Sequence, residues 1–235
     1  MPQTSDGNSA LQTQVIDNPN EVGNQLQQLG KFTQEDFQQA ISAANLSRAD
    51  ETAHSTKGYA GSTFYSNLIK QLRDILVVKG FKPHTHQNIE LVLNDTVAIA
   101  VCKGDENTGK TTQDPHSARK KGGVTLALFG LSQNELPQNG ELFEESDSLK
   151  INRGKLQLEI DGKERDVWIL MHYSQKIANG EYRVKTELSQ PSTYDKNGRI
   201  NFFSNRIMLE LMDLNIESQP NSETQFTDDI DFNIE

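Results

Sequence analysis

Cysteine is nearly absent from this sequence. Cys102 is the only one among 235 residues, so no disulfide can form within the chain. A lone thiol is typical of proteins that stay in the reducing cytoplasm. The first residues also lack the basic stretch and apolar segment of a secretory signal, and no apolar run approaches the roughly 20 residues of a membrane span. We therefore expect a cytoplasmic protein without a membrane segment.

Apolar residues are scarce as well. They make up 34% of the chain, which is low for a compact domain, so part of the chain is expected to lie outside the core. The excess of acids that gives the net charge of −10 lies in the two terminal regions of the chain. Residues 213–235 contain seven acids and no Lys or Arg, residues 1–61 contain seven acids and three bases, and the 19 acids and 20 bases between them nearly cancel.

The composition divides the chain into three regions. Residues 1–61 are rich in Gln and Asn and contain two short amphipathic helical patterns, which we interpret as a loosely attached, solvated arm with a disordered start and a linker. Residues 62–213 are expected to form the core domain. Residues 214–235 are expected to be a disordered acidic tail.

Within the core, the apolar pattern changes from helical to extended near Gly80. An apolar stripe over about residues 63–79 predicts one long amphipathic helix. Beyond it, strand pairs are predicted in "IELVLNDTVAIAV" and "KLQLEIDGKERDVWILMHY", and single strands in "VTLALFG" and "NRIMLELM". The alternation in "EYRVKTEL" predicts a strand with one buried apolar face and one solvated charged face. The predicted fold class is α+β, with the helix packed on a mainly antiparallel sheet.

Residues 104–111 match the phosphate-loop motif G-x-x-x-x-G-K-T. A functional loop of this kind follows a buried parallel strand and opens a helix whose N-terminus faces the phosphates. Here the preceding strand is expected to belong to an antiparallel hairpin, and Pro115 leaves little room for a helix. Asp105 and Glu106 would also place negative charge in the loop. We interpret the match as coincidental and predict no nucleotide cofactor; a binding assay decides whether it binds any nucleotide.

The same stretch belongs to a long polar loop, residues 103–123, that is rich in bases. Adjacent cations on a flexible loop can follow a phosphate backbone without reading its sequence, and the alternative is an ordinary solvated loop. The loop contains no aromatic residue, so a platform for base stacking would have to come from the sheet. The predicted contact residues for DNA or RNA are Lys103, Lys110, His116, Arg119, Lys120 and Lys121.

Patterns for catalysis or metal binding are few. His84 and His86 would point the same way from a strand, but no spacing singles out a third ligand, so no metal site is predicted. The sequence contains neither a Gly-x-Ser-x-Gly elbow nor a His-Glu-x-x-His motif. Val101 stands where a restriction-type nuclease would need an acid before Lys103. No catalytic residue is assigned, and a nucleotide- or metal-dependent enzyme is the least favoured hypothesis.

The tail mixes acids with apolar side chains in "SETQFTDDIDFNIE". Since it cannot bury its own apolar groups, it is expected either to be idle or to dock a protein partner. "DDIDF" is similar to the acidic tip of bacterial single-stranded DNA-binding proteins, which recruits replication and repair partners, although that tip ends on its Phe. Folding back on the basic loop, or a role in solubility, are the alternatives. The predicted docking residues are Phe226, Asp228, Asp229, Ile230, Asp231 and Phe232.

Four segments, "KGDENTG", "WILMHY", "TELSQP" and "NRIMLEL", resemble an uncharacterised group of bacterial proteins associated with plasmids and integrative elements. The resemblance covers about residues 62–213. It implies one domain there and an association with DNA or with defence and counter-defence proteins, but no activity. The first hypothesis is a non-enzymatic accessory protein that contacts nucleic acid through the basic loop and a protein through the tail. The second is a protein-binding modulator of a nucleic-acid enzyme that does not itself contact nucleic acid.

Overall fold

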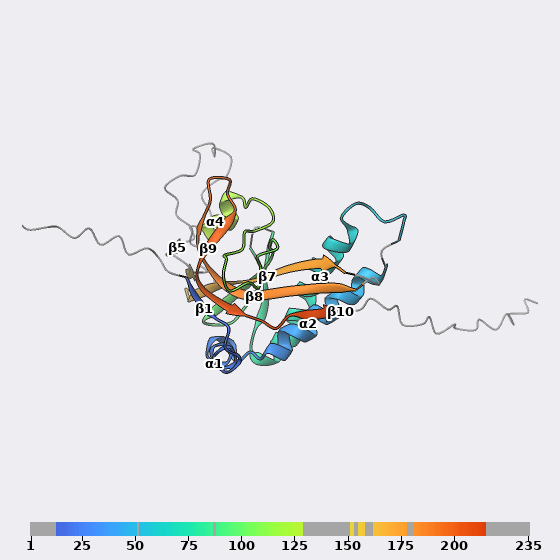
Figure 1. Cartoon of the computed structure of the whole chain (residues 1–235). Helices are drawn as coiled ribbons and strands as arrows, with labels where there is room; N and C mark the ends of the chain where they lie inside the picture. Colours follow the sequence, from blue (N-terminus) through green and yellow to red (C-terminus); the bar gives the residue numbers. More distant parts are fainter. Residues whose placement is uncertain are drawn as a thin grey trace, which may run out of the picture.

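The protein is an α+β fold, as predicted. The computed structural model describes residues 13–50, 52–86, 88–128, 151–152, 155–157, 162–177 and 181–214. Three helices near the N-terminus cover one face of a twisted mixed sheet, and a short helix lies on the other side (Figure 1).

The three covering helices are α1 (Pro19–Gly30), α2 (Gln34–Leu46) and α3 (Tyr59–Leu76). A capping box starts α2, because the Thr33 hydroxyl accepts from the Asp36 N–H and the Asp36 carboxylate accepts from the Thr33 N–H. Short 3-10 turns follow two of the helices, η1 (Ser47–Asp50) and η2 (Val77–Lys79). The latter ends at Gly80, whose φ of 86° favours glycine. Within the described residues, no helix has the length and apolar character needed to cross a membrane.

The main path through the sheet is β1-β9-β8-β7-β4-β3-β2. Neighbouring strands are antiparallel except for two parallel pairs, β1 with β9 and β4 with β7. Off this path, β10 pairs with β8, β5 with β6, and β6 with β7. The strands are β1 (Gln14–Ile16), β2 (Lys82–His86), β3 (Ile89–Leu93), β4 (Val97–Lys103), β5 (Ile151–Asn152), β6 (Lys155–Gln157), β7 (Glu164–Lys176), β8 (Tyr182–Tyr194), β9 (Ile200–Met208) and β10 (Met212–Leu214).

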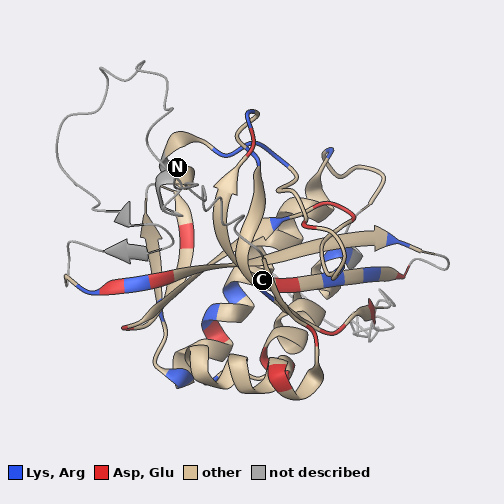
Figure 2. Ribbon diagram, turned by 60° about the vertical axis from the view of Figure 1, so that its left-hand side comes forward, with Lys and Arg blue, Asp and Glu red and all other residues tan. Residues whose placement is uncertain are grey.

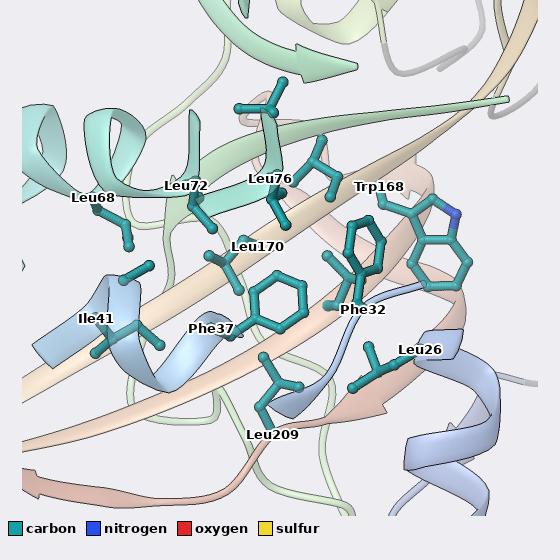
Figure 3. Close-up of a cluster of buried hydrophobic side chains, with 14 of the residues drawn as sticks. Leu26, Phe32, Phe37, Ile41, Leu68, Leu72, Leu76, Trp168, Leu170 and Leu209 are labelled. Carbon is teal, nitrogen blue, oxygen red and sulfur yellow. The ribbon is translucent and has the colours of Figure 1, made fainter. Parts of the chain in front are cut away.

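Apolar side chains are buried on both faces of the sheet. On the helix face, α2 and α3 pack against β7, where Phe37, Leu72 and Leu170 meet (Figure 3). On the opposite face, a second cluster includes Cys102, Phe203 and Leu126, the last from the short helix α4 (Gly123–Leu128). The sheet therefore forms the middle layer of the molecule, which explains why its central strands read as nearly continuous apolar runs.

The interpretation of the N-terminal region as a loosely attached arm is wrong for residues 13–50. Leu26, Phe32 and Phe37 are fully buried in the same cluster as α3 and the sheet. The Phe32 ring lies 5.5 Å from the ring of Phe37 and 5.1 Å from that of Phe81, between centroids. The many Gln and Asn residues hid this docking, because a helix needs only one narrow apolar stripe to pack.

Other details of the predicted fold also change. Residues 124–128 of the expected strand in "VTLALFG" lie in α4 instead, and the predicted long helix begins at Tyr59 and is one of the three covering helices. The expectation of antiparallel surroundings for β4 holds for β3 on one side, whereas β7 on the other side is parallel. The two predicted strand pairs are confirmed, as β3 with β4 and β6 with β7. The expected acidic tail lies outside the described residues, apart from Leu214.

Replacing Phe37 by Ala tests the docking of this N-terminal region. Phe37 is fully buried, so Phe37→Ala is expected to lower the free energy of unfolding by about 3–5 kcal/mol in urea denaturation. Leu46→Ala in the same helix is the control, because Leu46 is 57% exposed. Two small and similar losses would mean that α2 does not pack on the core.

Candidate functional site

A buried ion pair joins β8 and β9 on the face opposite the three helices. Arg206 of β9 and Glu187 of β8 each have side chains that are 0% exposed. Arg206 Nη2 donates to Glu187 Oε2 at 2.6 Å, and Arg206 Nε donates to Glu187 Oε1 at 3.0 Å. This two-pronged geometry is the strong form of an arginine–carboxylate pair.

The remaining donors of Arg206 hold the long polar loop against the sheet. Nη1 donates to the Gln113 carbonyl and to Asp114 Oδ1, both at 3.0 Å, and Nη2 donates to the Lys110 carbonyl at 2.9 Å. All five N–H groups of the guanidinium therefore have acceptors. Asp114 also accepts from the Thr13 hydroxyl at 3.1 Å, which connects the loop to the residue before β1.

Glu187 is satisfied in the same way. In addition to Arg206, its carboxylate accepts from the Ser189 hydroxyl at 2.7 Å and from the Gly109 N–H at 2.8 Å. The prediction of a solvated charged face on this strand is therefore wrong at Glu187, although Arg183 on the same face is partly exposed. The loop covers Glu187, which is buried as part of a paired and hydrogen-bonded group.

The phosphate-loop motif folds as a compact turn. No helix follows Lys110 until α4 begins at Gly123. The N–H groups of Thr108 and Lys110 donate within the turn to the Asp105 and Asn107 carbonyls, and the Gly109 N–H donates to a carboxylate of the chain itself. Backbone donors that would bind a phosphate in a nucleotide loop are thus occupied by internal acceptors.

Beyond this turn, the loop bonds to the first residue of β9 and to the turn before it. The Ser117 N–H donates to the Ile200 carbonyl at 2.9 Å, and the Ile200 N–H donates to the Ser117 hydroxyl at 3.1 Å. Further on, the Lys121 N–H donates to the Gly198 carbonyl at 2.7 Å. On its other side, the Ala118 N–H donates to the Lys103 carbonyl at 2.8 Å. These bonds place the "ARKK" segment between the end of β4 and the turn that joins β8 to β9.

This arrangement collects bases from three separate segments of the chain. Figure 2 shows blue bands of Lys and Arg on the loop and on the β8–β9 turn, at the top of the view. Five of the six bases are exposed, and Lys121 is half-buried. We name this group the basic ridge; it consists of Lys103, Arg119, Lys120, Lys121, Lys196 and Arg199.

The basic ridge overlaps in part with the predicted contact residues. Two of those residues contact other side chains of the loop: Lys110 Nζ donates to Asn107 Oδ1 at 2.9 Å, and His116 lies 3.4 Å from a carboxylate oxygen of Asp105. Lys196 and Arg199 were not among the predicted contact residues. The "DKNGR" segment does signal a turn between strands, but nothing local shows that this turn meets the loop.

Acids beside the basic ridge are largely engaged in local contacts. The Asp195 carboxylate accepts from the N–H groups of Arg199 and Asn197, and these bonds hold the pKa of Asp195 below its ordinary value. Asp114 pairs with Arg206 and Asp105 with His116. Residues 103–123 and 195–199 together contain seven Lys or Arg against four acids, so the surface is net positive.

A second buried polar group lies on the helix face of the sheet. His172 is 4% exposed and packs on the Phe64 ring, with centroids 4.9 Å apart. Burial, together with the positive charges of Arg48, Lys103 and Lys121, lowers the pKa of His172 to about 3. The imidazole is therefore neutral at physiological pH. The Arg48 guanidinium itself lies over the rings of Phe64 and Tyr182, at 4.0 and 4.5 Å from their centroids.

His84 and His86 lie on β2, at the edge of the sheet. Within the residues that the structure describes, no three His, Cys, Asp or Glu side chains gather in a way that could hold a metal ion. The predicted docking residues of the tail, Phe226 to Phe232, lie outside the described residues.

Breaking the buried ion pair is expected to be costly. Arg206→Met leaves the Glu187 carboxylate buried without its cation, so the free energy of unfolding is expected to fall by about 3–5 kcal/mol in urea denaturation. The double variant Arg206→Met/Glu187→Leu should lose less than the single variant. Arg183→Met is the matched control, because its ion pair with Asp213 is exposed and little change is expected. Equal losses in the Arg206 and Arg183 variants would contradict this role.

The neutral state of His172 predicts a loss of stability in acid. The folded protein keeps His172 unprotonated down to about pH 3, whereas the unfolded chain takes up a proton near pH 6.5. The contribution is therefore complete above pH 6.5 and declines as the pH falls toward 3, by about 2 kcal/mol between pH 7 and pH 5. Urea denaturation of wild type and His172→Gln at both pH values measures it. The same pH dependence in both proteins would contradict the prediction, because it would show that His172 takes up its proton over the same pH range in the folded and the unfolded protein.

Comparison with known proteins gives no match of any kind: no protein family, no curated protein and no solved structure matches this chain.

Proposed function

We propose that this is a non-enzymatic accessory protein that binds nucleic acid through the basic ridge. The observation that supports the proposal is the meeting of three sequence segments at one place, where five exposed cations stand around the β8–β9 turn. Lysine and arginine gathered in this way bind phosphate groups by charge, without reading the base sequence. Binding of this kind is expected in the cytoplasm and requires no cofactor.

The support beneath the basic ridge favours the same function. Bonds from Ser117, Ala118 and Lys121 attach the loop to β9, β4 and the β8–β9 turn, and Arg206 attaches its first half to the sheet. A loop that is already ordered loses less conformational entropy when it binds a ligand. The cations are therefore presented on a rigid support rather than on a flexible tether.

The acidic tail supplies the second part of the proposal. Phe226 and the "DDIDF" segment would dock a protein partner, while the basic ridge contacts the phosphates. An association with plasmids or integrative elements, and with defence or counter-defence proteins, belongs to this proposal because it follows from the resemblance of residues 62–213.

Charge reversal on the basic ridge tests the proposal. We expect Lys120→Glu/Lys196→Glu/Arg199→Glu to weaken binding of a labelled single-stranded oligonucleotide at least tenfold in fluorescence anisotropy. Three lost phosphate contacts should also reduce the slope of log affinity against log salt by about 2. The control is Lys57→Glu/Lys82→Glu/Lys176→Glu, which changes the net charge equally at exposed sites outside the basic ridge.

Each result has a distinct meaning. Loss in the basic-ridge variant alone supports a local contact surface, and equal loss in both variants shows a general charge effect. Absence of binding by the wild-type protein, even at low salt, contradicts the proposal. That result favours the second hypothesis, a modulator that contacts only other proteins. The acidic tail would then be used to capture its protein partners.

A further inference from the structure

An exposed aromatic side chain lies on β9 close to the basic ridge. Phe202 is 45% exposed, and it is the only aromatic among the large exposed apolar residues in the described part of the chain. It follows Ile200 by two residues, about 7 Å along the strand. Ile200 is the residue whose backbone bonds to Ser117, just before Arg119, Lys120 and Lys121. The sheet thus supplies the aromatic residue that the loop lacks.

Irregular pairing between β8 and β9 accounts for the exposure of Phe202. The register shifts at Pro191 and again beside Thr193, so that Pro191 faces Phe203 and Thr193 faces Phe202. Such bulges re-aim side chains and are common beside functional sites. Here Phe203 is 1% exposed and belongs to the core cluster, whereas its neighbour Phe202 is turned toward solvent.

We infer that Phe202 stacks on a base of a single-stranded nucleic acid whose phosphates contact the basic ridge. This inference rests on the proposed function and names its ligand class. Bases of a single strand expose their flat faces, whereas those of a duplex are stacked on one another. An aromatic side chain beside a cationic groove is the usual means of binding single strands without sequence preference. The charge of the basic ridge favours a polyanion over an apolar protein surface as the occupant.

Removing the aromatic ring of Phe202 should weaken the binding of single strands much more than the binding of duplexes. Phe202→Ala is expected to weaken binding of a single-stranded oligonucleotide about 5- to 150-fold, the range found for one base–aromatic stack. Binding of a duplex of the same sequence should change less than twofold. Leu211→Ala, at a residue that is 55% exposed and precedes β10, is the matched control and should alter neither affinity.

A second variant keeps the test independent of any effect of Phe202→Ala on folding. Phe202→Trp retains an aromatic ring and introduces a fluorescent reporter. The chain contains one native tryptophan, Trp168, which is 8% exposed in the helix-face core. Stacking of a base is expected to quench the new tryptophan on addition of the single strand but not of the duplex, while the wild-type emission stays constant.

The outcomes distinguish this inference from the proposed function. Loss of single-strand affinity in Phe202→Ala, with quenching in Phe202→Trp, supports it. If the charge-reversed basic ridge abolishes binding but both Phe202 variants bind as wild type without quenching, the protein contacts phosphates alone and Phe202 is left to a protein partner. Equal loss of single-strand and duplex binding would make Phe202 a support for the turn. Absence of binding by wild type overturns the inference and the function together.

Discussion

The guanidinium of Arg206 is the interaction on which the rest of this surface depends. Its five N–H groups join a carboxylate of β8, two carbonyls of the loop and the carboxylate of Asp114. Residues 103–123 contain very few apolar side chains, so burial of apolar surface cannot hold them on the sheet. A saturated polar network takes that role. Replacing such a network by apolar residues is often harmless to stability, so its value here lies in fixing one position of the loop.

The glycines of the phosphate-loop motif have structural reasons that are unrelated to nucleotides. A Cβ at Gly104 would lie 2.1 Å from the Thr108 hydroxyl oxygen, and Gly109 has a φ of 73° and sits against Lys185 of β8. Both positions exclude larger residues because the turn is compact and pressed against the sheet. The same letters that describe a phosphate cradle therefore also describe a tight turn around an internal carboxylate.

Local sequence patterns were sufficient to predict the secondary-structure elements, but not the contacts between elements that are distant in sequence. The helical stripe of α3 and the strand pairs at Asn94 and Gly162 follow from spacing alone, because each concerns neighbouring residues. The docking of α1 and α2, the burial of Glu187 and the approach of the β8–β9 turn to the loop depend on contacts between distant segments. Composition misled in the first case, since many Gln and Asn surround a narrow apolar stripe. In the case of Glu187, the alternating pattern of β8 predicted a solvated face. The segment that covers Glu187 is a polar loop, which leaves no apolar signal in the sequence of the strand.

The two parallel strand pairs have a consequence for how the chain reaches this structure. β1 pairs with β9, so the first described strand cannot pair until one of the last strands has been made. β4 likewise pairs with β7, which follows it only after a long stretch of sequence. During synthesis, the apolar faces of α1, α2 and α3 emerge well before β8 and β9, against which they are finally packed. Contacts of such long sequence separation make folding slow and leave apolar surface uncovered in the meantime. The nascent chain therefore needs either a chaperone or rapid folding to avoid aggregation. At this stage the strands that form the surface of the basic ridge have not yet been synthesised.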